Sequence, residues 1–327
     1  MPYKHYTSLM RDQLQLLLGQ GMNIKEISQE LAVHQSSVYR EIKRNSVGNQ
    51  YISGRAQSSA VELRYQSKTC PKQSNPILRD YIQKSLEAYH SPEQISGRIA
   101  LDFPTDLKMK VSTETVYTIV YGMISMDINL KPFLRQAHKK RRKRLSGRDL
   151  RGCIPDRVMI DTRPQIVENK SRCGDWEGDT IEGAMKEGYI ATFVDRMTKL
   201  LIASKMENKK SATMVTTAIK TFKEIPAEFR ETLTLDNGKE FAGHLEMAKK
   251  LDMNIFFARP YHSWERGLNE HTNGLLRQFF PKGMSFYNLT HQALAKAVKA
   301  INNRPRKILG YRTPQEVWDL QKFALQI

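Results

Sequence analysis

Apolar residues in the first part of the chain recur at helical spacing. They predict two short helices, each burying one face, separated by a glycine-containing turn at 19–21. The apolar positions are Leu14, Leu17 and Leu18 in the first helix and Ile24, Ile27 and Leu31 in the second. The second set follows i, i+3, i+7, which places its members on one side of a helix.

A third helix is predicted after a short turn at 32–34, with Val38 and Ile42 facing inward. Its outward residues are Gln35, Ser37, Tyr39, Arg40, Lys43 and Arg44. A short helix, a tight turn and a helix with a polar and basic outer face are typical of a DNA-binding helix-turn-helix domain, here expected at 1–50. The alternative is a three-helix bundle with a solvated basic face, and the charge of the chain favours DNA binding.

A second helical domain is expected at 51–130. Ser91-Pro92-Glu93-Gln94 supplies the cap, the N1 proline and the N3 glutamine of a helix start, and Ile95 and Ile99 would face inward. Another helix opens at 112–117. Because its outward residues are less basic, the domain is either a second DNA-binding helix-turn-helix or a structural or dimerisation bundle, and we favour the former.

The pattern changes to short strands in the C-terminal half. Strands are predicted at 174–182, 189–195, 200–205, 232–235 and 254–258, and helices at 211–223, 240–251 and 264–280. The order βββαβαβα predicts a mixed sheet with helices on its faces, beginning with an antiparallel meander. This is the element order of an RNase H-like fold. The expected fold class is therefore α+β and multidomain, with N-terminal helix-turn-helix modules and an RNase H-like mixed α/β catalytic core at 171–327.

Charge and cysteine content narrow the function further. Lysine and arginine number 52 against 34 acidic residues, a net charge of +18. Residues 1–150 carry a net charge of +11, so the N-terminal half suits a polyanion-binding arm. The three cysteines form no Cys-x-x-Cys pair, which argues against a disulfide framework and a thiolate zinc site. We see no membrane-spanning apolar run or signal-peptide core, and expect a cytoplasmic protein without a membrane partner.

Acidic residues of the C-terminal half are candidate metal ligands. Asp179 lies on a predicted strand, Asp236 at the end of another, and Glu270 on a predicted helix. Three carboxylates from separate elements can hold two divalent cations, which clamp the attacking and leaving oxygens of a phosphoryl displacement. Glu177 and Asp175 share the strand face of Asp179, so geometry alone leaves Glu177 open as a ligand.

Other polar groups near these acids have structural explanations. Glu240 and Glu265 are expected in salt bridges or in solvent, and Asp195 in a structural turn. His271 is expected to be a surface or half-buried histidine. Arg266 and Arg277 share a polar helix face with Glu270 and would contact flanking DNA phosphates.

A basic linker is expected at 131–170. It contains six consecutive cations: Lys139, Lys140, Arg141, Arg142, Lys143 and Arg144. Such a run repels itself and is solvated when free. A plain tether is one interpretation. We favour a strap along a DNA backbone, because the run joins a DNA-binding half to a candidate DNA-cutting half.

Several motifs resemble those of bacterial insertion-sequence transposases of the DDE class, in particular the insertion sequence thirty family. They are Asp-Trp-Glu-Gly-Asp at 175–179, Asp-Asn-Gly-Lys-Glu-Phe at 236–241 and Glu-Arg-Gly-Leu-Asn-Glu-His at 265–271. The stretches 302–307 and 311–314 resemble that family's C-terminal signature. The resemblance covers nearly the whole chain, although Asp175 stands where we expect histidine and Glu265 where glutamine is commoner.

The resemblance implies that Asp179, Asp236 and Glu270 are the catalytic residues and ligate Mg²⁺, for which Mn²⁺ can substitute. It implies binding of double-stranded DNA at terminal inverted repeats, metal-dependent strand cleavage and strand transfer into target DNA. A homodimer or higher homo-oligomer follows, because a mobile element has two ends. End joining through a circular intermediate and association with the bacterial nucleoid are implied as well.

Two other classes of protein are alternatives. A retroviral-type integrase shares the core but expects an N-terminal zinc module, and the histidines and Cys70 of this chain lack its spacing. A repressor built on an inactive core is the non-enzymatic alternative, and the intact carboxylates argue against it.

Overall fold

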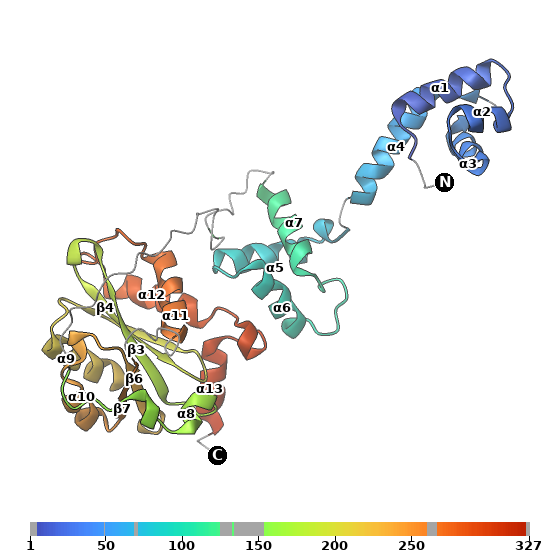
Figure 1. Cartoon of the computed structure of the whole chain (residues 1–327). Helices are drawn as coiled ribbons and strands as arrows, with labels where there is room; N and C mark the ends of the chain where they lie inside the picture. Colours follow the sequence, from blue (N-terminus) through green and yellow to red (C-terminus); the bar gives the residue numbers. More distant parts are fainter. Residues whose placement is uncertain are drawn as a thin grey trace. The chain divides into compact units, whose positions relative to one another are not determined.

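The computed structural model describes residues 5–48, 50–68, 71–124, 133, 154–259 and 267–324 (Figure 1). The chain forms two compact units, Met1–Pro76 and Ile77–Ile327. Within the described ranges, none of the helices combines the length and the apolar character needed to cross a bilayer.

The first unit is a helical bundle. Its elements are α1 (Ser8–Gly19), α2 (Ile24–Glu30), α3 (Gln35–Asn45), β1 (Ser46–Val47), β2 (Gln50–Tyr51) and α4 (Ser53–Lys68). Leu14, Ile27 and Val38 are fully buried, so the predicted inward faces of the three helices are confirmed. The unit extends beyond the boundary predicted at residue 50, because α4 packs on α1 and buries Ala56 in the same core.

The second unit begins with three more helices, α5 (Pro76–Glu87), α6 (Pro92–Asp102) and α7 (Thr113–Ile124). Ser91 and Gln94 form the predicted capping box at the start of α6. Ile95 and Ile99 are buried as predicted, against apolar side chains of α5 and α7. This three-helix bundle is therefore held together by its own apolar core.

The remainder of the second unit is built on a five-stranded mixed sheet. Its strands are β3 (Asp175–Glu182), β4 (Tyr189–Asp195), β5 (Leu201–Met206), β6 (Thr232–Leu235) and β7 (Asn254–Phe257). The spatial order is β5-β4-β3-β6-β7. The pairs β3–β4 and β4–β5 are antiparallel, and the pairs β3–β6 and β6–β7 are parallel. The predicted meander and mixed sheet are confirmed, and the arrangement is RNase H-like.

Helices cover both faces of this sheet (Figure 1). Trp176 and Phe193 belong to the apolar cluster that includes α9 (Ser211–Phe222), α10 (His244–Leu251) and Trp318 of α13 (Pro314–Ala324). Ile181 and Ile190 belong to the cluster that includes α11 (Gly267–Phe279) and α12 (His291–Asn302). Because side chains alternate along a strand, the odd-numbered residues of β3 face α11.

The end of the predicted linker is part of this domain. Residues 154–170, including α8 (Gln165–Asn169), bury Ile154 and Val167, and Met159 forms a parallel bridge with Phe257 of β7. The linker predicted to run to 170 is therefore shorter, because these apolar residues pack on the sheet. The six cations at 139–144 lie outside the described residues.

Candidate active site

Asp179 lies on β3, and Asp236 directly follows the neighbouring strand β6, at the same level of the sheet. In the parallel pair β3–β6, Glu177 is in register with Thr234. Asp179 and Asp236 are each two positions further on, so both point to the face covered by α11. Asp236 directly follows β6, and its Oδ1 accepts a hydrogen bond of 2.9 Å from the Gly238 amide. The fold therefore brings these two predicted ligands together.

Asn273 of α11 holds the carboxylate of Asp179. Its Nδ2 donates to Asp179 Oδ2 at 2.8 Å, and its Oδ1 accepts from Thr192 Oγ1 of β4 at 3.1 Å. The Thr180 amide donates to Asp179 Oδ1 at 2.8 Å. Both carboxylate oxygens are thus oriented by fixed donors, one on the strand and one on the helix.

Glu270 lies one turn before Asn273 on α11, and its side chain is exposed. Residues at i and i+3 share one side of a helix, so Glu270 is on the side of α11 that reaches Asp179. Among the described residues, however, no three His, Cys, Asp or Glu side chains are arranged to hold a metal ion. The structure therefore places Asp179 and Asp236 at matching positions of β3 and the end of β6, and Glu270 on the helix that contacts Asp179, but the three carboxylates do not form a metal-binding cluster.

Glu177 has a structural role in this fold. Its Oε1 accepts a hydrogen bond of 2.6 Å from Arg196 Nη1 in a fully buried ion pair. Its Oε2 accepts from the Asn269 amide in the first turn of α11 at 3.2 Å. Negative charge at a helix N-terminus is favourable. Glu177 therefore fixes the start of the helix that carries Glu270.

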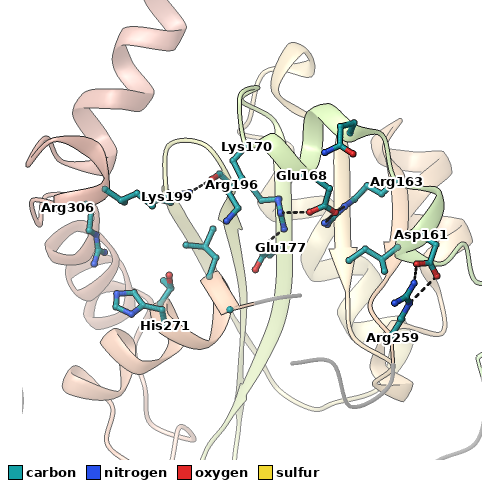
Figure 2. Close-up of a pocket in the computed structure, with 16 residues that line it drawn as sticks. Asp161, Arg163, Glu168, Lys170, Glu177, Arg196, Lys199, Arg259, His271 and Arg306 are labelled. Carbon is teal, nitrogen blue, oxygen red and sulfur yellow. Dashed lines mark hydrogen bonds and ion pairs between the residues drawn. The ribbon is translucent and has the colours of Figure 1, made fainter. Parts of the chain in front are cut away.

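A pocket of about 780 Å³ lies beside Glu177 and the start of α11 (Figure 2). Its cationic side chains are Arg163, Lys170, Arg196, Lys199, Arg259 and Arg306. Its acidic side chains are Asp161, Glu168 and Glu177, and His271 lines it as well. Figure 2 shows the ion pairs that link Arg163 to Glu168 and Arg196 to Glu177. Cations therefore exceed acids six to three in this pocket.

Crowding of positive charge in the pocket affects Lys199. Burial, followed by repulsion from Lys170, lowers the pKa of Lys199 to about 8. Burial likewise lowers the pKa of Arg196, against the opposing charge of Glu177. Both shifts arise mainly from burial, which disfavours the charged forms of the two side chains.

Lys209 is a cation near the carboxylates that the sequence pattern did not reveal. Its Nζ lies 3.0 Å from Glu240 Oε1, which also accepts from Thr180 Oγ1 at 2.9 Å. Burial alone would lower the pKa of Lys209. The hydrogen bond to Glu240 and the negative charges of Glu240, Asp236 and Glu182 outweigh burial, so the pKa of Lys209 is raised. The expected salt bridge of Glu240 is confirmed. Lys209 was missed because only folding brings it beside strands β3 and β6.

The remaining acids of the first strands have internal partners. Asp195 accepts from the Thr198 amide at 2.7 Å and from the Gly174 amide at 2.9 Å. Asp175 pairs with Arg172 at 2.8 Å and accepts from Thr232 Oγ1 at 2.8 Å. Asp195 is the expected turn residue, and Asp175 joins β3 to β6.

The residues predicted to contact DNA differ in their exposure and in their contacts within the protein. On α3, Gln35, Tyr39, Arg40, Lys43 and Arg44 are exposed, and Ser37 is partly exposed. Arg277 of α11 donates to the Glu182 carbonyl at 2.8 Å and stacks over Phe286. That pair of contacts gives Arg277 a role within the domain. Arg266 lies outside the described residues.

Comparison with known proteins extends these observations. The family model described as "Integrase core domain" matches residues 169–263. The chain is 41% identical over 315 residues to the transposase for insertion sequence element IS4351 of Bacteroides fragilis, covering 96% of this chain and 95% of that protein. It is 33% identical over 319 residues to transposase InsI for insertion sequence element IS30A of Escherichia coli strain K12, covering 96% and 83%.

The chain belongs to the IS30 family of insertion-sequence transposases. The family resemblance predicted from the motifs is confirmed, and with it a function in DNA transposition. The matched integrase core contains Asp179 and Asp236 and ends before Glu270. Among solved structures, the catalytic core domain of BIV integrase aligns with a TM-score of 0.39 and 18% identity, covering 48% of this chain and all of that domain.

Proposed function

We propose that this transposase binds the terminal inverted repeats of an insertion sequence, cleaves DNA at the element ends and transfers the ends to target DNA. One observation carries the catalytic part. Asp179 on β3 and Asp236 just after β6 each lie two positions beyond the in-register pair Glu177–Thr234, and Asn273 connects Asp179 to the helix that bears Glu270. Two positioned carboxylates with a third on the adjoining helix are what two-metal phosphoryl transfer requires.

The donor set fits Mg²⁺, with Mn²⁺ as a substitute. Asp179, Asp236 and Glu270 offer only carboxylate oxygens, the hard ligands that Mg²⁺ takes together with water and phosphate oxygens. Asp179 and Asp236 are only partly buried, so their oxygens can reach a bound substrate. Bound ions would stabilise charge on the phosphoryl oxygens and make water more nucleophilic. Glu270, in the first turn of α11, would supply the third carboxylate.

The same site would carry out two phosphoryl transfers, strand cleavage and then strand transfer. Water first displaces the 3′ oxygen of the element end from phosphorus, which leaves a free 3′-OH. That hydroxyl then attacks a target phosphate and displaces another 3′ oxygen. Each step exchanges one P–O bond for another, so no covalent enzyme intermediate is required. Asn273 and the Thr180 amide would keep the Asp179 oxygens oriented through both steps.

The cationic pocket suits the DNA backbone beside the reacting phosphate. It adjoins Glu177, two residues from Asp179 on the same strand face. The excess of cations over acids in the pocket would attract the phosphodiesters of a DNA strand whose reacting phosphate lies at Asp179. A bound phosphate would offset the repulsion between Lys199 and Lys170.

Sequence recognition would reside in the N-terminal unit. The exposed polar and basic residues of α3 form the outer face of the second helix in a helix-turn-helix. The run at 139–144 would strap along the backbone. A homodimer or higher homo-oligomer would bring two element ends together in the cytoplasm of a bacterium, next to the nucleoid.

The catalytic assignment is tested by cleavage of a labelled duplex carrying an element end. Asp179→Asn and Asp236→Asn should each abolish Mg²⁺-dependent nicking while DNA binding stays at the wild-type level. Asp252→Asn is the matched control, since this exposed left-handed cap on α10 accepts asparagine equally well. Nicking by either site variant at the wild-type rate would refute the assignment.

A further inference from the structure

The helix α6 is joined to the C-terminal segment of the catalytic domain by several independent contacts. Both lie in the second compact unit. We call this contact the α6 interface. Its main members are Gly97 and Arg98 of α6 and Tyr311 and Glu316 near and within α13.

Gly97 is the most informative residue of this interface. A glycine inside a helix weakens it, because glycine is a poor helix former. A Cβ atom at position 97 would lie 2.3 Å from Cδ1 of the Tyr311 ring. The ring therefore packs directly on the helix backbone, and only glycine leaves room for it. The interface accounts for a residue that the helix alone would disfavour.

Arg98, the next residue, makes a two-pronged ion pair across the interface. Its Nη1 and Nη2 each donate to a different oxygen of Glu316 at 2.7 Å, and its Nε donates to Asp102 at 2.9 Å. Glu316 also accepts from the Thr313 amide at 2.8 Å, which caps α13. A bidentate arginine–carboxylate pair is geometrically specific. It fixes the orientation of α6 against the start of α13.

One aromatic contact and one ion pair extend the interface, and the aromatic contact reaches α11. The ring of Tyr89 lies 4.7 Å, centroid to centroid, from that of Phe279 at the end of α11. Lys307 pairs with Glu93 at 2.6 Å, although both side chains are largely exposed and contribute little. The bundle thus touches the C-terminal end of the helix whose first turn carries Glu270.

We propose that the α6 interface fixes the bundle of α5, α6 and α7 to the catalytic domain as a positioning device. Gly97, Arg98, Tyr311 and Glu316 are its positioning residues. With the bundle acting as the second DNA-binding module that the sequence favours, DNA held on it would be presented to Asp179 and Asp236 at one set distance, so cleavage would fall at one position. This consequence for cleavage rests on the proposed function, whereas the fixed interface itself does not.

The test uses Gly97→Ala in the full-length chain. Alanine is the better helix former, so the variant should stabilise α6 if the interface does not exist. If the interface is as proposed, the added methyl displaces Tyr311, and amide hydrogen exchange in α6 and in 307–316 should rise on the order of tenfold. Gly54→Ala is the matched control, because a Cβ there meets nothing within 4 Å and exchange should stay unchanged.

Two further variants keep the test independent of a folding defect. Gly97→Ala combined with Tyr311→Gly removes the ring that collides, so the pair should exchange no faster than Tyr311→Gly alone. Tyr311 has a φ of +65°, which glycine adopts readily. Glu316→Gln keeps the cap to Thr313 but removes the charge facing Arg98, and should raise exchange in α6. Wild-type exchange in both Gly97→Ala and Glu316→Gln would overturn the proposal.

Cleavage mapping separates this inference from the proposed function. On an element-end duplex, wild type should cut at one position. Gly97→Ala and Glu316→Gln should bind equally well and spread their cuts over neighbouring positions. One unchanged cleavage position in both variants would overturn the positioning role. If wild type does not cleave at all, the proposed function fails, and hydrogen exchange alone still decides whether the interface exists.

Discussion

Asn273 donates a hydrogen bond of 2.8 Å to the carboxylate of Asp179. This contact connects the helix that bears Glu270 to the strand that bears the first carboxylate. A second hydrogen bond, from Thr192 Oγ1 to Asn273 Oδ1, fixes the orientation of the Asn273 side-chain amide. The positions of two predicted ligands are therefore coupled through a residue that is not itself expected to bind metal.

Replacing Asn273 should impair catalysis without unfolding the domain. Asn273→Ala removes the donor that orients Asp179 Oδ2 and should lower the cleavage rate by about 10- to 100-fold. The measurement is single-turnover cleavage at saturating DNA. Thr216→Ala, on the exposed side of α9, serves as the control. An Asn273→Ala rate equal to that of the control would show that orientation of Asp179 does not matter.

Glu177 and Asp179 should respond differently to the same chemical change. Glu177→Gln leaves the buried Arg196 with only its more distant pair to Glu168, at 3.5 Å, and should lower the free energy of unfolding by about 3 kcal/mol. Asp179→Asn removes a partly exposed carboxylate and should leave stability nearly unchanged in metal-free buffer. Denaturant unfolding of both variants without metal makes the comparison. Equal stability of the two variants would contradict the structural role of Glu177.

The sequence pattern predicted more of the fold than of the site. Short apolar runs separated by short loops were enough to predict the strands, and helices bury both faces of the sheet that they form. Asp179 and Asp236 were predicted from their motifs, and the parallel pairing of β3 with β6 places each of them two positions beyond an in-register pair. The Asn273 contact and the position of Lys209 could not be predicted, because both depend on the packing of helices over the sheet.

Domain boundaries were predicted less well for a related reason. The start of α4 carries no sequence signal that it packs on α1, and the folded structure reveals it through the burial of Ala56 and the hydrogen bond from Arg11 to Gln57. The packing of 154–170 likewise depends on a strand edge distant in sequence, where Met159 meets Phe257. Gly97 is unfavourable for the α6 helix on its own, and the ring that requires a glycine there belongs to Tyr311, more than two hundred residues away.

Acid should weaken the second unit through His90. Burial, then the positive charge of Arg304, lowers the pKa of His90 to about 4 from its usual 6.5, with Arg98 also repelling the protonated ring and a backbone hydrogen bond with Asn303 opposing the shift. The unfolded chain therefore takes up a proton between pH 6.5 and 4 that the folded chain does not, and stability falls across this window.

The thermal unfolding midpoint at pH 7 and pH 5 measures this effect. Wild type should lose more stability than His90→Gln over that interval. The ion pair with Arg98 lowers the pKa of Glu316 below its usual 4.5. The stability that this pair contributes is therefore lost only below pH 4.5, outside the interval from pH 7 to pH 5. An equal loss in wild type and His90→Gln would contradict the assignment to His90.

The basic face of α3 should show itself in the salt dependence of DNA binding. Arg40→Ala, Lys43→Ala and Arg44→Ala should each weaken binding and lower the slope of log affinity against log salt by about 1 where the side chain meets a phosphate. Lys250→Ala, which removes an exposed cation paired with Glu246 on α10, should leave the slope unchanged. Identical slopes for all four variants would place the DNA contact elsewhere.

The most direct test of the catalytic assignment is cleavage of an end-labelled duplex bearing the element's terminal repeat, with and without Mg²⁺, by wild type, Glu270→Gln and the exposed-acid control Glu246→Gln. We expect wild type and Glu246→Gln to nick only when Mg²⁺ is present, and Glu270→Gln to bind the duplex without nicking it. Mg²⁺-dependent nicking by Glu270→Gln at the wild-type rate would contradict the three-carboxylate site.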